Sequence, residues 1–233
     1  MPASTLVLPD PAVVADLRTY LGRADRIDRA SVRLVAGGGV LAVYTAVLHP
    51  AGLLDETPTV LGLRTVAVDE ANEVDAVVPI ASLTERLQRL EPPESGAVEL
   101  GLPAEVNTVT WAGVAPPRSN WRVVDRTSAE VLARVAQEGI LEVARSLPDD
   151  AGEHLVRRVR SEVWGRPIDG LEHVPAGAAF AAHSLGFLGD PGEDIRIFET
   201  GPWTRLSLQR GHVLVKRRGW TLSGSAGPVT LGA

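Results

Sequence analysis

The chain has 233 residues, a mass of 24.7 kDa and a formal net charge of −6 at pH 7. Hydrophobic residues make up 45% of it, which is enough for a buried core and excludes an intrinsically disordered chain. It contains no cysteine, so a disulfide framework, a thiolate metal site and a cysteine nucleophile are excluded. All its basic residues except Lys216 are arginines, which indicates a GC-rich coding sequence of the kind found in some bacteria.

The N-terminus lacks the pattern of a secretory signal. No basic segment precedes its apolar residues, and Pro9 and Pro11 interrupt them. No uncharged apolar run approaches the roughly 20 residues that span a bilayer, because Pro175 and His183 break the longest candidate, residues 174–188. We therefore expect a cytoplasmic protein with no membrane partner.

The first half of the chain is expected to combine an antiparallel sheet with two helices. Asp10 is placed to cap the first helix, and a capping box from Ser82 to Glu85 is placed to start the second. Between them, runs rich in β-branched residues predict strands. The expected elements are a helix over residues 11–26, two strands within 30–48, strands over 59–68 and 74–80, a helix over 82–90 and an extended stretch over 97–111.

Three glycines, Gly37 to Gly39, formally fit the G-x-G-x-x-G/A dinucleotide-binding pattern together with Ala42. That pattern requires a helix after the glycines and an acid about 20 residues further on. The residues that follow instead favour a strand, and the acid Asp69 lies 30 residues beyond Gly39. We therefore predict a hairpin turn at the glycines and no cofactor.

A segment containing proline and tryptophan divides the chain. Residues 113–121 cannot be helical through Pro116-Pro117, and the composition changes from strand-like to helical across them. We predict an N-terminal α+β subdomain over residues 1–112, a connecting loop over 113–121 and a C-terminal subdomain over 122–233. Arg118 and Trp121 are candidate recognition residues because rigid aromatic loops often bind partners, the alternative being that the indoles fix the loop to the core.

The second half is expected to hold a helical hairpin, a buried helix and a terminal β-meander, so that the whole chain has an α+β fold. A second capping box, from Thr127 to Glu130, is placed to start the hairpin. The expected elements are helices over residues 127–146, from 150 to about 163 and over 175–187, a loop over 165–174, and strands over 195–199, 203–209 and 212–217.

The last hairpin provides the sharpest candidate site. If Arg210-Gly211 forms its turn, Arg205 lies directly opposite Lys216, and opposed like charges destabilise a sheet unless a negative group is near. His212 follows the turn, and Trp203 and Trp220 bracket the basic strip, an arrangement that nucleic-acid surfaces also use.

The negative group can come from the chain itself or from a partner. Residues 195–233 contain six basic residues and one acid, Glu199, within an acidic chain. We expect an internal carboxylate ahead of an external anion, and the isoelectric point of about 5.4 disfavours nucleic acid.

No motif identifies a catalytic or metal site. The five histidines show no metal-ligand spacing, and His183-Ser184 in an apolar helix is expected to belong to the core. We expect a non-enzymatic binding or adaptor protein that engages a protein or another anionic ligand, without cofactor or metal. The alternative is an enzyme acting on a small anionic substrate held by Arg205, Arg210 and Lys216. The candidate site residues are Arg118, Trp121, Trp203, Arg205, Arg210, His212 and Lys216.

Overall fold

A computed structural model gives the fold and describes residues 5–28, 30–52, 54–91, 93–94, 96–106, 109–113, 115–148 and 150–216. Within these residues, five α-helices and one long antiparallel sheet form the α+β fold that the sequence predicts. The helices are α1 (Pro11–Ala24), α2 (Ile80–Arg89), α3 (Ala129–Ser146), α4 (Glu153–Gly165) and α5 (Ala176–Ser184), with a 3₁₀ turn, η1 (Thr110–Gly113). No helix in the described part of the chain is both long and apolar enough to span a membrane.

Strands make up the rest of the regular structure. They are β1 (Thr5–Leu8), β2 (Ser31–Gly37), β3 (Val40–Leu48), β4 (Thr59–Ala67), β5 (Val74–Pro79), β6 (Val98–Gly101), β7 (Arg122–Ser128), β8 (Pro167–Ile168), β9 (Leu171–Pro175), β10 (Asp194–Thr200), β11 (Trp203–Leu208) and β12 (Gly211–Lys216). The main sheet has the order β5-β2-β3-β4-β12-β11-β10-β7, and two short sheets pair β1 with β6 and β8 with β9. Because β4 hydrogen-bonds to β12, one sheet runs through both halves of the chain.

Four strands were not expected from the sequence: β1, β7, β8 and β9. Strands β1 and β8 have only four and two residues, too short to show a period of two. Strand β7 lies at the sheet edge, and its exposed, mixed residues lack the alternation that marks a half-buried strand. In the extended stretch expected over 97–111, the described residues form β6 and the start of η1 as regular structure.

The expected helix starts need correction by one to three residues. Helix α2 begins at Ile80 with Pro79 as its N-cap, so the predicted capping box at Ser82 is wrong. Helix α3 is capped by Ser128 instead of Thr127, and the Ser128 side chain accepts a hydrogen bond from the Val131 amide at 3.2 Å. Helix α4 begins at Glu153. At α3, Thr127 and Ser128 are both able to cap a helix and stand side by side, so the sequence alone does not decide between them.

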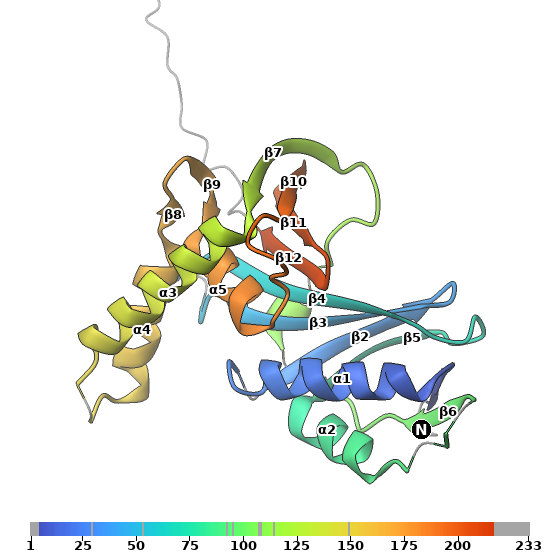
Figure 1. Ribbon diagram of the computed structural model, residues 1–233. Helices are drawn as coiled ribbons and strands as arrows, with labels where there is room; N and C mark the ends of the chain where they lie inside the picture. Colours follow the sequence, from blue (N-terminus) through green and yellow to red (C-terminus); the bar gives the residue numbers. More distant parts are fainter. Residues whose placement is uncertain are drawn as a thin grey trace, which may run out of the picture.

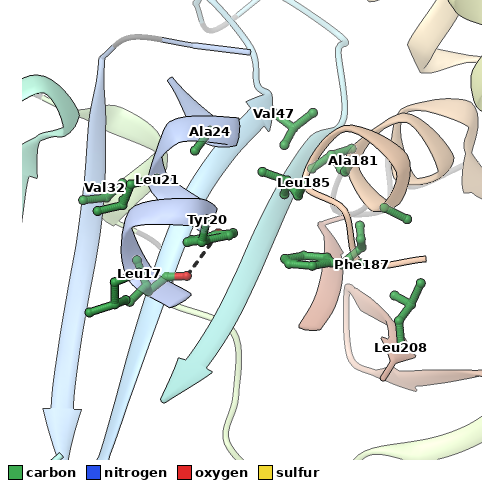
Figure 2. Packing of buried hydrophobic residues seen from close by; sticks show 14 of the residues in the cluster. Leu17, Tyr20, Leu21, Ala24, Val32, Val47, Ala181, Leu185, Phe187 and Leu208 are labelled. Carbon is green, nitrogen blue, oxygen red and sulfur yellow. Dashed lines mark hydrogen bonds between the residues drawn. The ribbon is translucent and has the colours of Figure 1, made fainter. Parts of the chain in front are cut away.

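The helices cover one face of the sheet (Figure 1). Helix α1 packs on β4 and α5 packs on β3, β4 and β12, while α3 and α4 pack against α5. The cap of α1 is as predicted, since Asp10 Oδ1 accepts a hydrogen bond from the Ala12 amide at 2.6 Å. Figure 2 shows Tyr20 of α1 facing Phe187, which follows α5 in the chain, and both side chains are buried. The core between the helices and the sheet therefore joins the two halves.

Tyr20 brings a buried hydroxyl into this core. Its hydroxyl shares a 2.8 Å hydrogen bond with Thr45 Oγ1 and lies 3.3 Å from the Val43 carbonyl oxygen. Burial raises the pKa of Tyr20 well above its usual value, because an ionised phenolate would be desolvated there.

We expect Tyr20→Phe to flatten the alkaline loss of stability. Above about pH 10 the unfolded chain releases the Tyr20 proton and the folded chain keeps it, so the wild-type free energy of unfolding falls by up to about 1.4 kcal/mol per pH unit from this group. At pH 8 the variant is destabilised by about 1 to 2 kcal/mol, because Thr45 loses its buried partner. Urea denaturation between pH 8 and pH 11 measures both effects. Burial also raises the pKa of Tyr44, which contributes equally to the two proteins; parallel slopes would contradict the assignment.

Candidate binding site on the open face of the sheet

The face of the sheet opposite the helices carries a crossing segment, which we define as residues 109–113 and 115–121. Its η1 turn packs Trp111 and Ala112 against an apolar cluster that includes Trp203 and Leu214. The Arg33 side chain fixes the segment to the sheet, since Arg33 Nη1 donates a hydrogen bond to the Ala112 carbonyl at 2.7 Å. Two cavities flank this contact, and both open on the face of the sheet opposite the helices.

The first cavity has a volume of about 570 Å³, within the size range of ligand sites. Its walls come from both halves of the chain, because Tyr44 on β3 pairs with Leu63 on β4, which pairs with His212 on β12. The crossing segment forms the remaining wall. We call it the arginine cavity, after Arg33, Arg118 and Arg205 in its lining. The other polar residues of the lining are Tyr44, Thr65, Asp75, Trp121 and His212.

Arg205 is clamped between two aromatic rings in the wall of the arginine cavity. Its guanidinium carbon lies 4.6 Å from the ring centroid of Trp121 and 4.6 Å from that of Phe198. The Trp121 indole N–H donates a 2.9 Å hydrogen bond to the Pro117 carbonyl, which fixes that ring. Burial and the charge of Arg196 lower the pKa of Arg205, but an arginine remains charged at neutral pH. The site thus holds a guanidinium in a fixed orientation.

The positive charge around Arg205 is not compensated within the described part of the chain. There, no carboxylate lies within ion-pair distance of Arg118, Arg196 or Arg205, and Arg205 Nε is buried without a hydrogen bond. Arg33 is different, because its Nε and Nη2 donate hydrogen bonds to both oxygens of Asp75 at 2.9 and 2.8 Å. This pairing raises the pKa of Arg33 and lowers that of Asp75. The cavity therefore keeps an excess of positive charge.

The expected pairing across the last hairpin is wrong. Leu208 pairs with Gly211, so Gln209 and Arg210 form the turn, and Arg205 lies opposite Leu214 instead of Lys216. The opposed like charges that motivated the site do not occur. The expected internal carboxylate is not found either: among the described residues none lies within ion-pair distance of Arg205, Arg210 or Lys216.

The structure divides the predicted site residues among three places. Arg118, Trp121, Arg205 and His212 meet in the arginine cavity. Trp203 and Lys216 line the second cavity of the open face, which has a volume of about 460 Å³. Arg210 lies near α1, where its carbonyl accepts a hydrogen bond from Arg64. Trp220, expected to bracket the strip, lies outside the described residues.

Four polar residues of the arginine cavity were not found by sequence reasoning: Arg33, Tyr44, Thr65 and Asp75. Arg33 and Tyr44 stand at outward strand positions between buried neighbours, and this isolated polar pattern was the available signal. Such residues usually face solvent, so the pattern alone does not mark a site. Their grouping with Arg205 depends on the pairing of β4 with β12, which joins residues about 150 positions apart.

Ser207 and His212 are the nearest approach to a catalytic pair. They face each other across the hairpin, with His212 Nδ1 at 3.2 Å from Ser207 Oγ. Burial and the charge of Arg205 lower the pKa of His212, so the ring is neutral at pH 7. A catalytic base is normally oriented by a third group, and the described residues supply no hydrogen-bond partner for His212 Nε2.

Two stretches of the chain match family models of unknown function. Residues 1–113 match the model described as domain of unknown function DUF8010, and residues 116–220 match domain of unknown function DUF8185. The gap between the two matches falls in the crossing segment. No curated protein matches the chain.

The fold is similar to that of bacterial DNA polymerase sliding clamps. A protein assigned as a DNA polymerase III beta subunit from Eubacterium rectale aligns with a TM-score of 0.54 and 9% identity, over 94% of this chain and 66% of that one. A sliding clamp from Pseudomonas aeruginosa aligns with a TM-score of 0.50 and 11% identity over 94% and 66% of the two chains. The Caulobacter crescentus pol III beta aligns with 0.50 and 10% over 91% and 65%. The chain thus spans about two thirds of the length of these clamps. At these identities the likeness shows a shared sliding-clamp-like fold, built here from two stretches that each match a domain of unknown function.

Proposed function

We propose that the chain is a binding protein without catalytic activity, acts in a DNA-associated setting and engages an anionic partner through the open face of its sheet. The observation that carries the proposal is the uncompensated guanidinium of Arg205, clamped between Trp121 and Phe198 at the arginine cavity. Guanidinium donors held in a fixed geometry suit carboxylate and phosphate groups. The likeness to sliding clamps supports the DNA-associated setting only through the fold.

Retention on polyanions tests this proposal. We expect the full chain to be retained by immobilised heparin or polyglutamate at low salt, and the double variant Arg118→Glu with Arg196→Glu to lose about tenfold or more in affinity. Both residues are exposed, so the melting temperature should change by only about 1 to 3 °C.

The matched control is Arg145→Glu with Arg158→Glu. It changes the net charge equally, but at exposed positions on α3 and α4. Equal losses in the two double variants would mean that net charge alone governs retention. A wild-type chain retained by neither polyanion would overturn the proposed function.

A further inference from the structure

We propose that the partner of the arginine cavity is a protein segment in which a carboxylate side chain stands beside a large apolar side chain. This inference rests on the proposed function and deepens it, because it names the class of the anionic partner. It draws on the two ends of the cavity, which differ in chemistry.

The charged end is built for a carboxylate. Arg205 lies at this end without a carboxylate partner among the described residues, and it cannot turn away because Trp121 and Phe198 hold it on both sides. A planar guanidinium fork matches the two oxygens of a carboxylate, and a charge-assisted pair of this kind gains strength in a partly desolvated site. An Asp or Glu side chain of a partner would supply the negative group that the described part of the chain lacks here.

The opposite end of the cavity carries an aliphatic patch. Val35 pairs with Ala42 across β2 and β3, and Val40 beside them leaves 47% of its surface exposed. Asp75 and Thr65, the neighbours of Val35 and Ala42 on β5 and β4, border this patch. Leu63 on β4 extends this wall toward His212. An apolar side chain placed here would leave water while the carboxylate beside it reaches the arginines. The lining of arginine, tyrosine and tryptophan also matches the residues that dominate protein–protein binding energy.

Single-stranded nucleic acid fits the same surface less well. Proteins that hold nucleic acid through its backbone commonly neutralise about 6 to 10 phosphates. Within the described residues, the uncompensated cations near the cavity are Arg118, Arg196 and Arg205. The rings of Trp121 and Phe198 already contact Arg205, so these faces are not available as platforms for bases. The net charge of −6 adds repulsion along a long polyanion.

Selection from two libraries tests the inference with the full chain. One library displays random dodecapeptides and the other consists of random 20-nucleotide single strands. We expect wild-type protein to enrich peptides in which Asp or Glu stands within two positions of Leu, Ile, Phe or Trp. Replacing that acid by its amide should weaken binding by about tenfold or more.

Two variants test whether the selected peptide binds in the arginine cavity. Arg205→Gln should weaken binding about tenfold or more, and Val40→Asp should do the same from the aliphatic end, at an exposed residue that the fold tolerates. Arg145→Gln on α3 is the control and should leave binding unchanged. If Arg205→Gln alters the fold, Val40→Asp still decides the outcome.

The failures of the two proposals are distinguishable. Enriched peptides without acids, or peptide binding that survives both variants, would overturn the inference. So would single strands that bind tighter than the best peptide and lose affinity with Arg205→Gln, although the proposed function would then stand. If neither library yields a binder and neither immobilised polyanion retains the protein, both proposals fail.

Discussion

Phe187→Ala is expected to lower the free energy of unfolding by about 3 to 5 kcal/mol, the range typical of a buried aromatic reduced to alanine. Phe187 is 2% exposed and follows α5 in the chain. Its ring stacks on Tyr20 of α1, with ring centroids 5.8 Å apart (Figure 2). It also covers Gly211 at the start of β12, where a Cβ atom would lie 2.6 Å from the ring. One side chain therefore holds α1, α5 and the last hairpin together.

Chemical denaturation measures this loss, and in a chain of this length it should lower the melting temperature by about 6 to 20 °C. Val124→Ala is the control, because Val124 is 45% exposed in the edge strand β7 and should change stability by less than about 0.5 kcal/mol. A loss below about 1 kcal/mol in Phe187→Ala would mean that the two halves do not depend on this contact.

Local sequence patterns were sufficient for much of the fold. Asp10 caps α1 as expected, and Gly38 and Gly39 form the predicted hairpin turn with φ of +61° and +76°. At the last hairpin, Leu206 and Val213 share the helix-covered face although the expected register is wrong. The error moved each partner by two residues, and a side-chain period of two leaves the faces unchanged.

The register error has a physical cause at Gly211. The glycine suggested a turn, but its φ is not in the positive range, and the ring of Phe187 is what excludes a side chain there. A glycine required by packing cannot be told from a turn glycine without the tertiary structure. The corrected register places Arg205 opposite Leu214 and away from Lys216.

The candidate site could be predicted only in part from the sequence, because it too depends on the tertiary structure. Arg118, Trp121, Arg205 and His212 were chosen from the connecting loop and the last hairpin, each by local chemistry. Arg33 joins them only because β4 and β12 pair, and no local pattern specifies which strands meet at that junction. The division at residues 113–121 stays a prediction about subdomains, although one sheet crosses from one half to the other.

Gly62→Val is expected to cost about 3 kcal/mol or more. Gly62 lies in β4 between two hydrogen-bonded neighbours, opposite Thr45 on β3 and Val213 on β12. A Cβ atom here would lie 2.1 Å from Leu185 Cδ1 and 3.0 Å from Thr45 Oγ1. The strand cannot move away because it is paired on both sides, so the strain of overpacking exceeds the better strand propensity of valine.

Gly37→Val in β2 is the matched control, because the nearest atom to its Cβ would be a Glu73 carboxylate oxygen at 3.7 Å, an ordinary contact. Its effect should stay within about 1 kcal/mol. Equal losses in the two variants would show that backbone entropy, and not the clash at Gly62, sets the cost.

A double-mutant cycle with Leu185→Ala identifies the clash directly. Leu185 is 1% exposed, so its truncation alone should cost about 2 to 5 kcal/mol by leaving a cavity. In the double variant the valine at position 62 would fill part of that cavity, so the combined loss should be smaller than the sum of the single losses by about 1 to 3 kcal/mol. Strict additivity would mean that Leu185 is free to move aside and that the halves pack less tightly at this junction. The same cycle bears on binding, since Leu63 next to Gly62 lines the arginine cavity on the opposite face.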